Sequence, residues 1–216
     1  IGNLMIDLYT WTTPNGRKVS ILLEELGISY NVFSIDIRKG AQFDPSFLNV
    51  APNNRIPAII DQQTGVQLME SGAIMLYLSN KYDKFCCSGQ EYWNMVEWLM
   101  WQMGGLGPML GQAHHFLRLN KGKSEYSEVR YTKETMRLYG VLDRRLQNRD
   151  FIAGAKKGVY TIADIACWPW VSRFEWHGID LLAFPNVLNW YVRIASRAAV
   201  QAGYSVPHFT TEIPMP

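Results

Sequence analysis

The chain has 216 residues, a length that suits one large or two small domains. Its formal net charge of +2 and its 48% hydrophobic residues are ordinary for a soluble globular protein. This near-balanced charge, with no Lys/Arg cluster recurring on a helical face, argues against nucleic-acid binding. No apolar run reaches the ~18 residues of a membrane span and no secretory signal is visible, so no membrane partner is expected. Three cysteines without regular spacing favour a reducing compartment, and we expect a cytoplasmic protein.

The first 83 residues carry the signals of a small α/β domain. Residues 5–10 and 30–37 alternate apolar and polar positions, as half-buried strands do. Between them, residues 19–26 have helical spacing and stop at Gly27, which suits the left-handed turn after a helix. Residues 58–61 and 66–69 flank a polar turn and predict a hairpin, after which Ser71 is expected to cap a helix running to about Tyr82.

The rest of the chain is expected to be helical. Residues 84–90 are predicted to form a linker, and helical patterns follow over residues 92–119, 125–148, from 161, and 185–196. Gly104-Gly105 and Gly107-Pro108 predict a kink or break in the first of these helices. The tail from Gly203 is expected to be irregular and to lie on the surface. The predicted fold class is therefore α/β plus all-α, with a thioredoxin-like N-terminal domain (residues 1–83) followed by an all-helical domain (residues 91–216).

The turn between the first strand and the first helix is the most informative stretch. It holds Thr13-Pro14-Asn15-Gly16, where a redox-active thioredoxin carries Cys-x-x-Cys. Hydroxyl and amide groups thus replace thiols in this turn. If the site handles sulfur, the reactive thiol must belong to a ligand.

A second candidate feature is Pro57, which is expected to occupy the first position of the third strand. In a thioredoxin-like unit the Ile56–Pro57 bond is expected to be cis, which turns the Ile56 backbone outward. The amide and carbonyl of Ile56 could then pair with a short peptide as an added strand. The alternative is that Pro57 merely begins a strand.

Glu70 and Ser71 stand at the beginning of a predicted helix, where backbone N–H groups and the helix dipole favour an anion. Ser71 can add a hydroxyl donor and Glu70 can hold an ammonium group. The pair therefore suits the α-amino acid end of a ligand. The alternative is a purely structural helix cap.

Other chemistry-bearing residues favour structural roles. His114 and His115 are adjacent on a predicted helix and point roughly 100° apart, and no metal-binding motif accompanies them, so no metal site is expected. The sequence Thr161-Ile162-Ala163-Asp164 is a capping box, to which we assign a folding role. Cys167 is expected to be buried, and the adjacent Cys86-Cys87 are expected to be surface thiols.

Taken in order, these motifs resemble the cytosolic glutathione transferases along nearly the whole chain. The resemblance is to the bacterial nu class and to its fungal relatives around the yeast nitrogen-catabolite repressor. The stretches that carry it are Thr13–Gly16, Pro52–Ile59, Glu70–Ile74, Gly104–Gln112 and Ala163–Trp170.

The resemblance implies a homodimer with two sites for glutathione, in its reduced or disulfide form, as cosubstrate. Thr13 and Asn15 would face the ligand sulfur as the catalytic residues. The implied glutathione-binding residues are Ile56 with Pro57 for the cysteinyl backbone, Glu70 and Ser71 for the γ-glutamyl end, Gln42 and Arg55 toward the glycyl end, and Arg130 from the helical domain. Tyr9 and Thr12 remain alternative donors to the sulfur.

The implied activity is glutathione-dependent reduction of disulfide bonds with the thiol of bound glutathione rather than a protein cysteine. A thiol has a pKa near 8.5, and donors from Thr13 and Asn15 at a helix N-terminus would favour its thiolate. One alternative is conjugation of small hydrophobic electrophiles, with Met109, Phe116 and Trp170 lining their pocket. A second alternative is a non-catalytic regulatory binding module.

Overall fold

The computed structural model describes residues 5–216, which divide into two compact units. One unit comprises the residues up to Lys84 together with Ser196–Ile213, and the other comprises Phe85–Ala195 with Pro214–Pro216. Residues 1–4 of the expected N-terminal domain lie outside the described range. The units differ from the expected domain limits mainly in residues 196–213, which pack with the N-terminal unit.

A four-stranded sheet forms the centre of the N-terminal unit, in the order β2-β1-β3-β4. Its strands are β1 (Ile6–Thr10), β2 (Tyr30–Ser34), β3 (Ala58–Asp61) and β4 (Gln67–Met69). β1 runs parallel to β2 and antiparallel to β3, and β3 pairs antiparallel with β4. This topology confirms the predicted thioredoxin-like fold.

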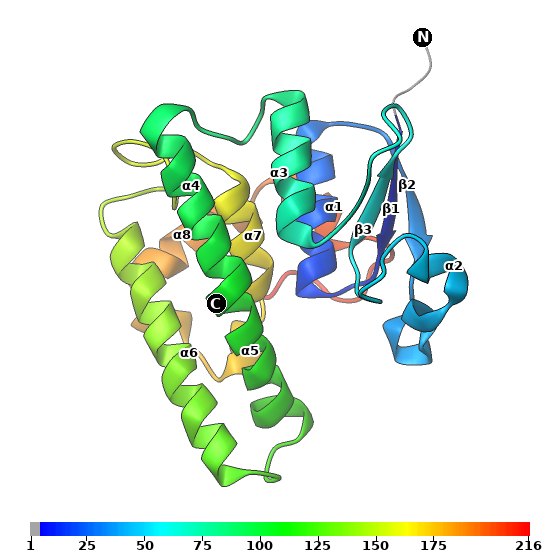
Figure 1. The fold of residues 1–216 in the computed structure, drawn as a ribbon. Coiled ribbons are helices and arrows are strands. Elements are labelled where there is room, and N and C mark those ends of the chain that lie inside the picture. The colour runs from blue at the N-terminus through cyan, green and yellow to red at the C-terminus, as the bar shows by residue number, and fades with distance from the viewer. Residues whose placement is uncertain (1–4) are drawn as a thin grey trace. The chain divides into compact units, whose positions relative to one another are not determined.

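Helices cover both faces of this sheet. α1 (Pro14–Leu26) and α3 (Ser71–Tyr82) lie on one face, and the short α2 (Pro45–Leu48) lies on the other (Figure 1). Tyr9 packs against a core cluster that contains Phe47 of α2. Because successive strand side chains point to opposite faces, the fully buried Leu8 belongs to the layer under α1 and α3.

Helix α1 begins at Pro14, five residues before the helical pattern of residues 19–26. Pro14 occupies its first turn, where a missing N–H is tolerated, and Thr13 is its N-cap. Gly27 ends the helix in the left-handed conformation with φ 67°, as predicted. The early start puts the Thr13–Gly16 turn at the positive end of the helix dipole.

The second unit is helical, as predicted. Its helices are α4 (Gly89–Trp101), α5 (Gly107–Ala113), α6 (Glu125–Leu146), α7 (Ile162–Val171) and α8 (Pro185–Ala195). π-Helical segments at Gln102–Leu106 and His114–Leu119 precede and follow α5. The chain thus stays helical past Pro108, which lies in the first turn of α5. No break occurs there, but the α-helical geometry is interrupted by the π-helical segment that contains Gly104 and Gly105, two of the residues that predicted a kink or break. The capping box of Thr161 and Asp164 is confirmed at the start of α7.

A further helix, α9 (Ala198–Tyr204), was not predicted from the sequence and packs on α1 within the N-terminal unit. Ser20 Oγ donates to the Gly203 carbonyl at 2.7 Å. A Cβ at Gly203 would lie 2.6 Å from the Cα of Ile21, so only glycine permits this approach. The irregular tail therefore begins after Tyr204 rather than at Gly203.

Two basic side chains fix the same C-terminal segment. The guanidinium of Arg17 lies 3.5 Å from the centre of the Tyr204 ring, and its Nε donates to the Tyr204 carbonyl at 3.0 Å. Arg197, just before α9, forms an ion pair with Glu25 of α1 at 2.6 Å. Residues from opposite ends of the chain thus share one core.

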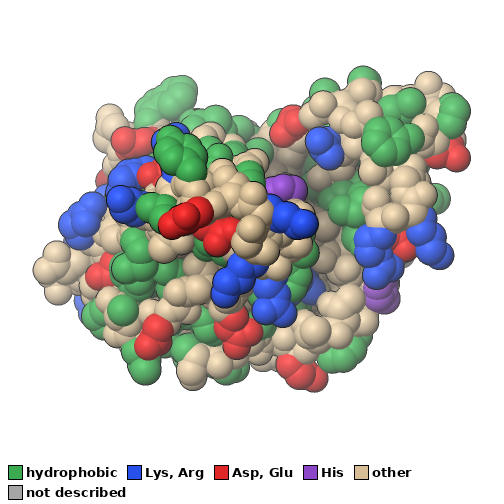
Figure 2. Space-filling model, turned by 90° about the horizontal axis from the view of Figure 1, so that it is seen from below, with side chains coloured by type: hydrophobic (Ala, Val, Ile, Leu, Met, Phe, Trp, Pro, Cys, Tyr) green, Lys and Arg blue, Asp and Glu red, His purple; other side chains and the backbone are tan. Residues whose placement is uncertain are grey.

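Among residues 5–216, no helix combines the length and apolar character that crossing a bilayer requires. On the face drawn in Figure 2, basic side chains alternate with acidic ones instead of forming one large basic area.

Candidate functional site

The turn before α1 presents several hydrogen-bond donors close together. Thr13 Oγ1 accepts the Gly16 N–H at 3.1 Å, so its hydroxyl proton is left for an outside acceptor. Asn15 is the second residue of α1 and is half-buried. A Cβ at Gly16 would overlap the Trp11 carbonyl oxygen, so glycine lets the turn pack tightly. These groups, with the first N–H groups of the helix, suit an anionic atom.

Tyr9, an alternative donor to the sulfur, has a packing role. Its ring stacks on Phe33 with centroids 4.7 Å apart, and burial together with the nearby Asp7 raises the pKa of its hydroxyl. The residue between strand and turn, Thr12, is half-buried. Thr12 has the same degree of burial as Thr13 and Asn15, so it stays an alternative donor.

The Ile56–Pro57 peptide bond is cis, as predicted. β3 begins at Ala58, and within the described part of the chain the amide and carbonyl of Ile56 have no backbone hydrogen bond. The Ile56 backbone, which lies just before β3, can therefore pair with an extended peptide segment. Arg55, directly before it, is exposed.

Gln42 lies in a 3₁₀ turn formed by Ala41–Phe43. Its Oε1 is buried and has no hydrogen-bond partner among the residues that the structure describes. Buried polar atoms are rarely left unpaired, so this oxygen is one that a ligand could satisfy.

Glu70 and Ser71 depart from the predicted helix cap. Ser71 was expected to cap α3, but Glu70 occupies the cap position and its side chain makes no capping bond. Glu70 has φ 69°, a costly conformation for a residue other than glycine, and Asn53 Nδ2 donates to its Oε1 at 3.4 Å. Ser71 is the first residue of α3, and its buried Oγ accepts from Lys18 Nζ at 3.3 Å. The expectation of a capping Ser71 is therefore wrong.

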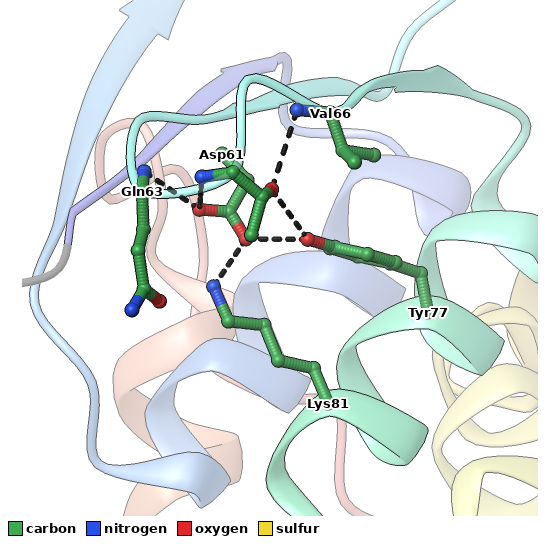
Figure 3. A network of polar contacts seen from close by, with 6 residues as sticks. Asp61, Gln63, Val66, Tyr77 and Lys81 are labelled. Carbon is green, nitrogen blue, oxygen red and sulfur yellow. Dashed lines mark hydrogen bonds and ion pairs between the residues drawn. The ribbon is translucent and has the colours of Figure 1, made fainter.

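Helix α3 is anchored by a buried carboxylate at the far end of β3. Asp61 lies between two side chains of α3 and the hairpin backbone (Figure 3). Tyr77 Oη donates to Asp61 Oδ2 at 2.6 Å, Lys81 forms an ion pair with the same oxygen, and the Gln63 N–H reaches Oδ1 at 2.9 Å. Burial alone would raise the pKa of the Asp61 carboxyl, but these hydrogen bonds hold it below its usual value.

Arg130 belongs to the helical unit and is described with that unit alone. It is exposed on α6 and lines an open pocket of about 540 Å³ together with Met109, Tyr126 and Tyr131. Met109 was expected in the pocket for an electrophile. Of the other two expected lining residues, Phe116 stacks on Tyr131 at 5.4 Å and Trp170 is buried.

His114, the first residue of the π-helical segment after α5, packs against other aromatic rings. His114 stacks on His177 with centroids 4.6 Å apart, and Tyr139 Oη lies 2.9 Å from His177 Nδ1. Burial, assisted by the charge of Arg173, lowers the pKa of His114 to about 4. Among residues 5–216, no group of three or more His, Cys, Asp or Glu side chains is placed to hold a metal ion.

All three cysteines of the chain lie outside the N-terminal unit. Cys86 and Cys87 are half-buried before α4, and Cys167 is buried in α7. Burial raises the pKa of the Cys87 thiol, with smaller contributions from Glu91 and Cys86. The unit that holds the Thr13–Gly16 turn therefore contains no thiol of its own.

Two parts of the sequence match the two domains of one known protein family. Residues 5–80 match the N-terminal domain of glutathione S-transferases, and residues 99–198 match their C-terminal domain. The chain belongs to the glutathione S-transferase family.

Within this family the chain is similar to the disulfide-bond oxidoreductase YfcG of Escherichia coli, with 47% identity across 90% of this chain and 92% of that protein. It is also 33% identical to the transcriptional regulator URE2 of Saccharomyces cerevisiae, across 88% of this chain and 64% of that protein. A glutathione transferase from Pseudomonas putida, crystallised with one glutathione disulfide bound per subunit, has 38% identity and a TM-score of 0.87 across 94% of this chain and 92% of that one. These relatives confirm the resemblance to the nu-class and fungal branch.

Proposed function

We propose that the protein is a glutathione-dependent disulfide-bond oxidoreductase whose reactive thiol is that of bound glutathione. The observation that carries the proposal is a thioredoxin-like unit that has the turn at the start of α1 and the cis bond before Pro57 but contains no cysteine. The activity in the name of YfcG and the glutathione disulfide held by the Pseudomonas putida protein support it.

In this proposal different residues of the N-terminal unit bind different parts of glutathione. The Ile56 backbone beside Pro57 pairs with the cysteinyl residue as an added strand, and Glu70 with Ser71 binds the γ-glutamyl end. Gln42 and Arg55 serve the glycyl end. The unpaired Oε1 of Gln42 supports its part, because a ligand N–H would satisfy it.

The chemistry is thiol–disulfide exchange. Thr13 and Asn15 donate hydrogen bonds to the ligand sulfur and the α1 dipole adds positive potential, so more of the thiol is ionised at neutral pH. The thiolate attacks one sulfur of the substrate disulfide, forms a mixed disulfide and releases the other sulfur as a thiolate, which takes up a proton. A second glutathione thiolate then attacks the mixed disulfide, which yields glutathione disulfide and the second substrate thiol.

We further propose that the protein acts in the cytoplasm as a homodimer. Large apolar side chains are exposed on α4 and α6, among them Trp93, Met100, Val129 and Met136. Surfaces of this kind are commonly covered by a partner, and a second copy of the chain would do so. Light scattering after size-exclusion chromatography tests this: a mass near twice 24.8 kDa is expected, and a monomer would contradict it.

The test of the proposed activity removes every protein thiol. The variant Cys86→Ser, Cys87→Ser, Cys167→Ala should retain most of the wild-type turnover of hydroxyethyl disulfide with glutathione. Loss of turnover in a correctly folded variant would instead assign the thiol to the protein. Chlorodinitrobenzene measured in parallel tests the alternative, because much faster turnover of that electrophile would favour conjugation.

A further inference from the structure

Two basic residues of α1 stand side by side in the sequence and are both buried. Arg17 is directed to the C-terminal segment, where it contacts Tyr204 and Thr210. Lys18 is 1% exposed and instead donates from Nζ to Ser71 Oγ at 3.3 Å. The buried ammonium group therefore lies directly beside the first residue of α3.

The ammonium of Lys18 adds to a positive potential that already exists at this point. Ser71 is the first residue of α3, where the helix dipole and the first backbone N–H groups favour an anion. Because an ammonium group only donates hydrogen bonds, Ser71 Oγ is the acceptor in this contact and its proton points to a different group. The contact thus fixes how the Ser71 hydroxyl is oriented.

We infer that Lys18 is a positioning residue for the α-carboxylate of the γ-glutamyl end, acting through Ser71. The inference rests on the proposed function, since it concerns the same ligand. α1 then acts on two parts of the ligand. Its N-cap Thr13 and its second residue Asn15 face the sulfur, and Lys18, one turn later, supports Ser71 at the γ-glutamyl end.

A purely mechanical role for Lys18 makes a different prediction. If Lys18 only ties α1 to α3, replacing it should weaken the binding of every ligand of the site to the same extent. A well-packed apolar side chain usually provides such a tie at lower cost than a buried charge. If Lys18 supports the carboxylate, replacing it should weaken the binding only of ligands that carry that group.

The experiment compares Lys18→Met with wild type by competition binding of three tripeptides. These are glutathione, glutaryl-Cys-Gly, which lacks the amino group, and 4-aminobutyryl-Cys-Gly, which lacks the carboxylate. We expect about tenfold weaker binding of the first two and a change of no more than about twofold for the third. Lys18→Arg should restore most of the affinity. Lys84→Met, which removes an exposed charge from the same unit, is the control and should bind as wild type.

Equal binding of glutathione by wild type and Lys18→Met, or equal losses for all three tripeptides, would overturn the inference. Failure of the wild type itself to bind glutathione would instead overturn the proposed function. If Lys18→Met does not fold, Lys18→Gln gives the same comparison, because its amide can still donate to Ser71 without the charge.

Discussion

In the proposed mechanism, Thr13 performs two tasks at one position. Its Oγ1 accepts the Gly16 N–H and so caps α1, while its hydroxyl proton is available to a ligand sulfur. Asn15 adds a side-chain amide one turn from the buried Lys18. The proposal thus gives the residues that start α1 a chemical function as well.

Asn15→Ala should reduce the turnover of hydroxyethyl disulfide about tenfold or more, because a hydrogen bond to a charged group contributes about 1.5–3 kcal/mol. Steady-state kinetics with glutathione measures the effect. Asn80→Ala, at an exposed position of α3, is the matched control. Kinetics identical to wild type would assign the stabilisation of the thiolate to another group.

The sequence allowed most of the candidate site to be predicted, because its motifs are local. The Thr13–Gly16 turn, the cis bond before Pro57 and the Glu70-Ser71 pair are each readable within a few residues. Lys18 was not identified, since a lysine in a helical pattern usually lies in solvent. Only the packing of α1 against α3, which no local pattern encodes, buries it beside Ser71.

At the scale of elements, α3 is held at both ends. Its N-terminus carries Ser71, and its C-terminal half supplies Tyr77 and Lys81 to the buried carboxylate of Asp61 (Figure 3). This network ties α3 to the hairpin that follows the cis bond. The position of Ser71, the proposed anchor of the γ-glutamyl end, therefore depends on a polar cluster at the other end of the helix.

Lys81→Met should destabilise the N-terminal unit by roughly 3 kcal/mol, because it leaves a buried carboxylate without its cation. Tyr77→Phe should cost about 1–2 kcal/mol, because it removes the hydrogen bond to Asp61 and the one shared with Thr64 Oγ1. Urea denaturation measures both values. A loss below about 0.5 kcal/mol in Lys81→Met would show that the network is not an anchor.

The same network predicts a dependence on pH. The pKa of Asp61 is lowered in the folded state, so its contribution to stability is complete above about pH 4 and is lost as the pH falls through the folded-state pKa. Unfolding of wild type and Asp61→Asn between pH 6 and pH 3 tests this prediction. The difference in stability should shrink toward pH 3, and a constant difference would contradict it.

At the scale of the whole molecule, the predicted architecture is confirmed, but the packing of the C-terminal helix α9 in the N-terminal unit was not predicted. Hydrophobic periodicity and turn residues predicted the strands and most helices, because both signals are local. The packing of α9 on α1 joins residues about 180 positions apart, and nothing in residues 198–204 alone indicates it. The π-helical segments around α5 likewise depend on packing rather than on a recognisable pattern.

The contribution of His114 to the stability of the helical unit should fall as the pH decreases from about 6.5 to 4. Burial, with Arg173, lowers the pKa of His114 to about 4, so over this range the unfolded chain binds a proton that the folded one does not. The effect is at most about 3 kcal/mol. Asp164, whose pKa burial raises to about 6, acts in the opposite direction. His114→Phe should therefore lose less stability than wild type between pH 7 and pH 4.5, measured by urea denaturation, and parallel pH profiles would contradict the assignment.

The most direct measurement is the pKa of the glutathione thiol when bound to the variant without cysteines, in which no other thiol absorbs. Ultraviolet titration of the complex should show thiolate forming at least about one pH unit below the ordinary value of 8.5, and adding Asn15→Ala should reverse part of the shift. A bound thiol that titrates as in solution would contradict the account.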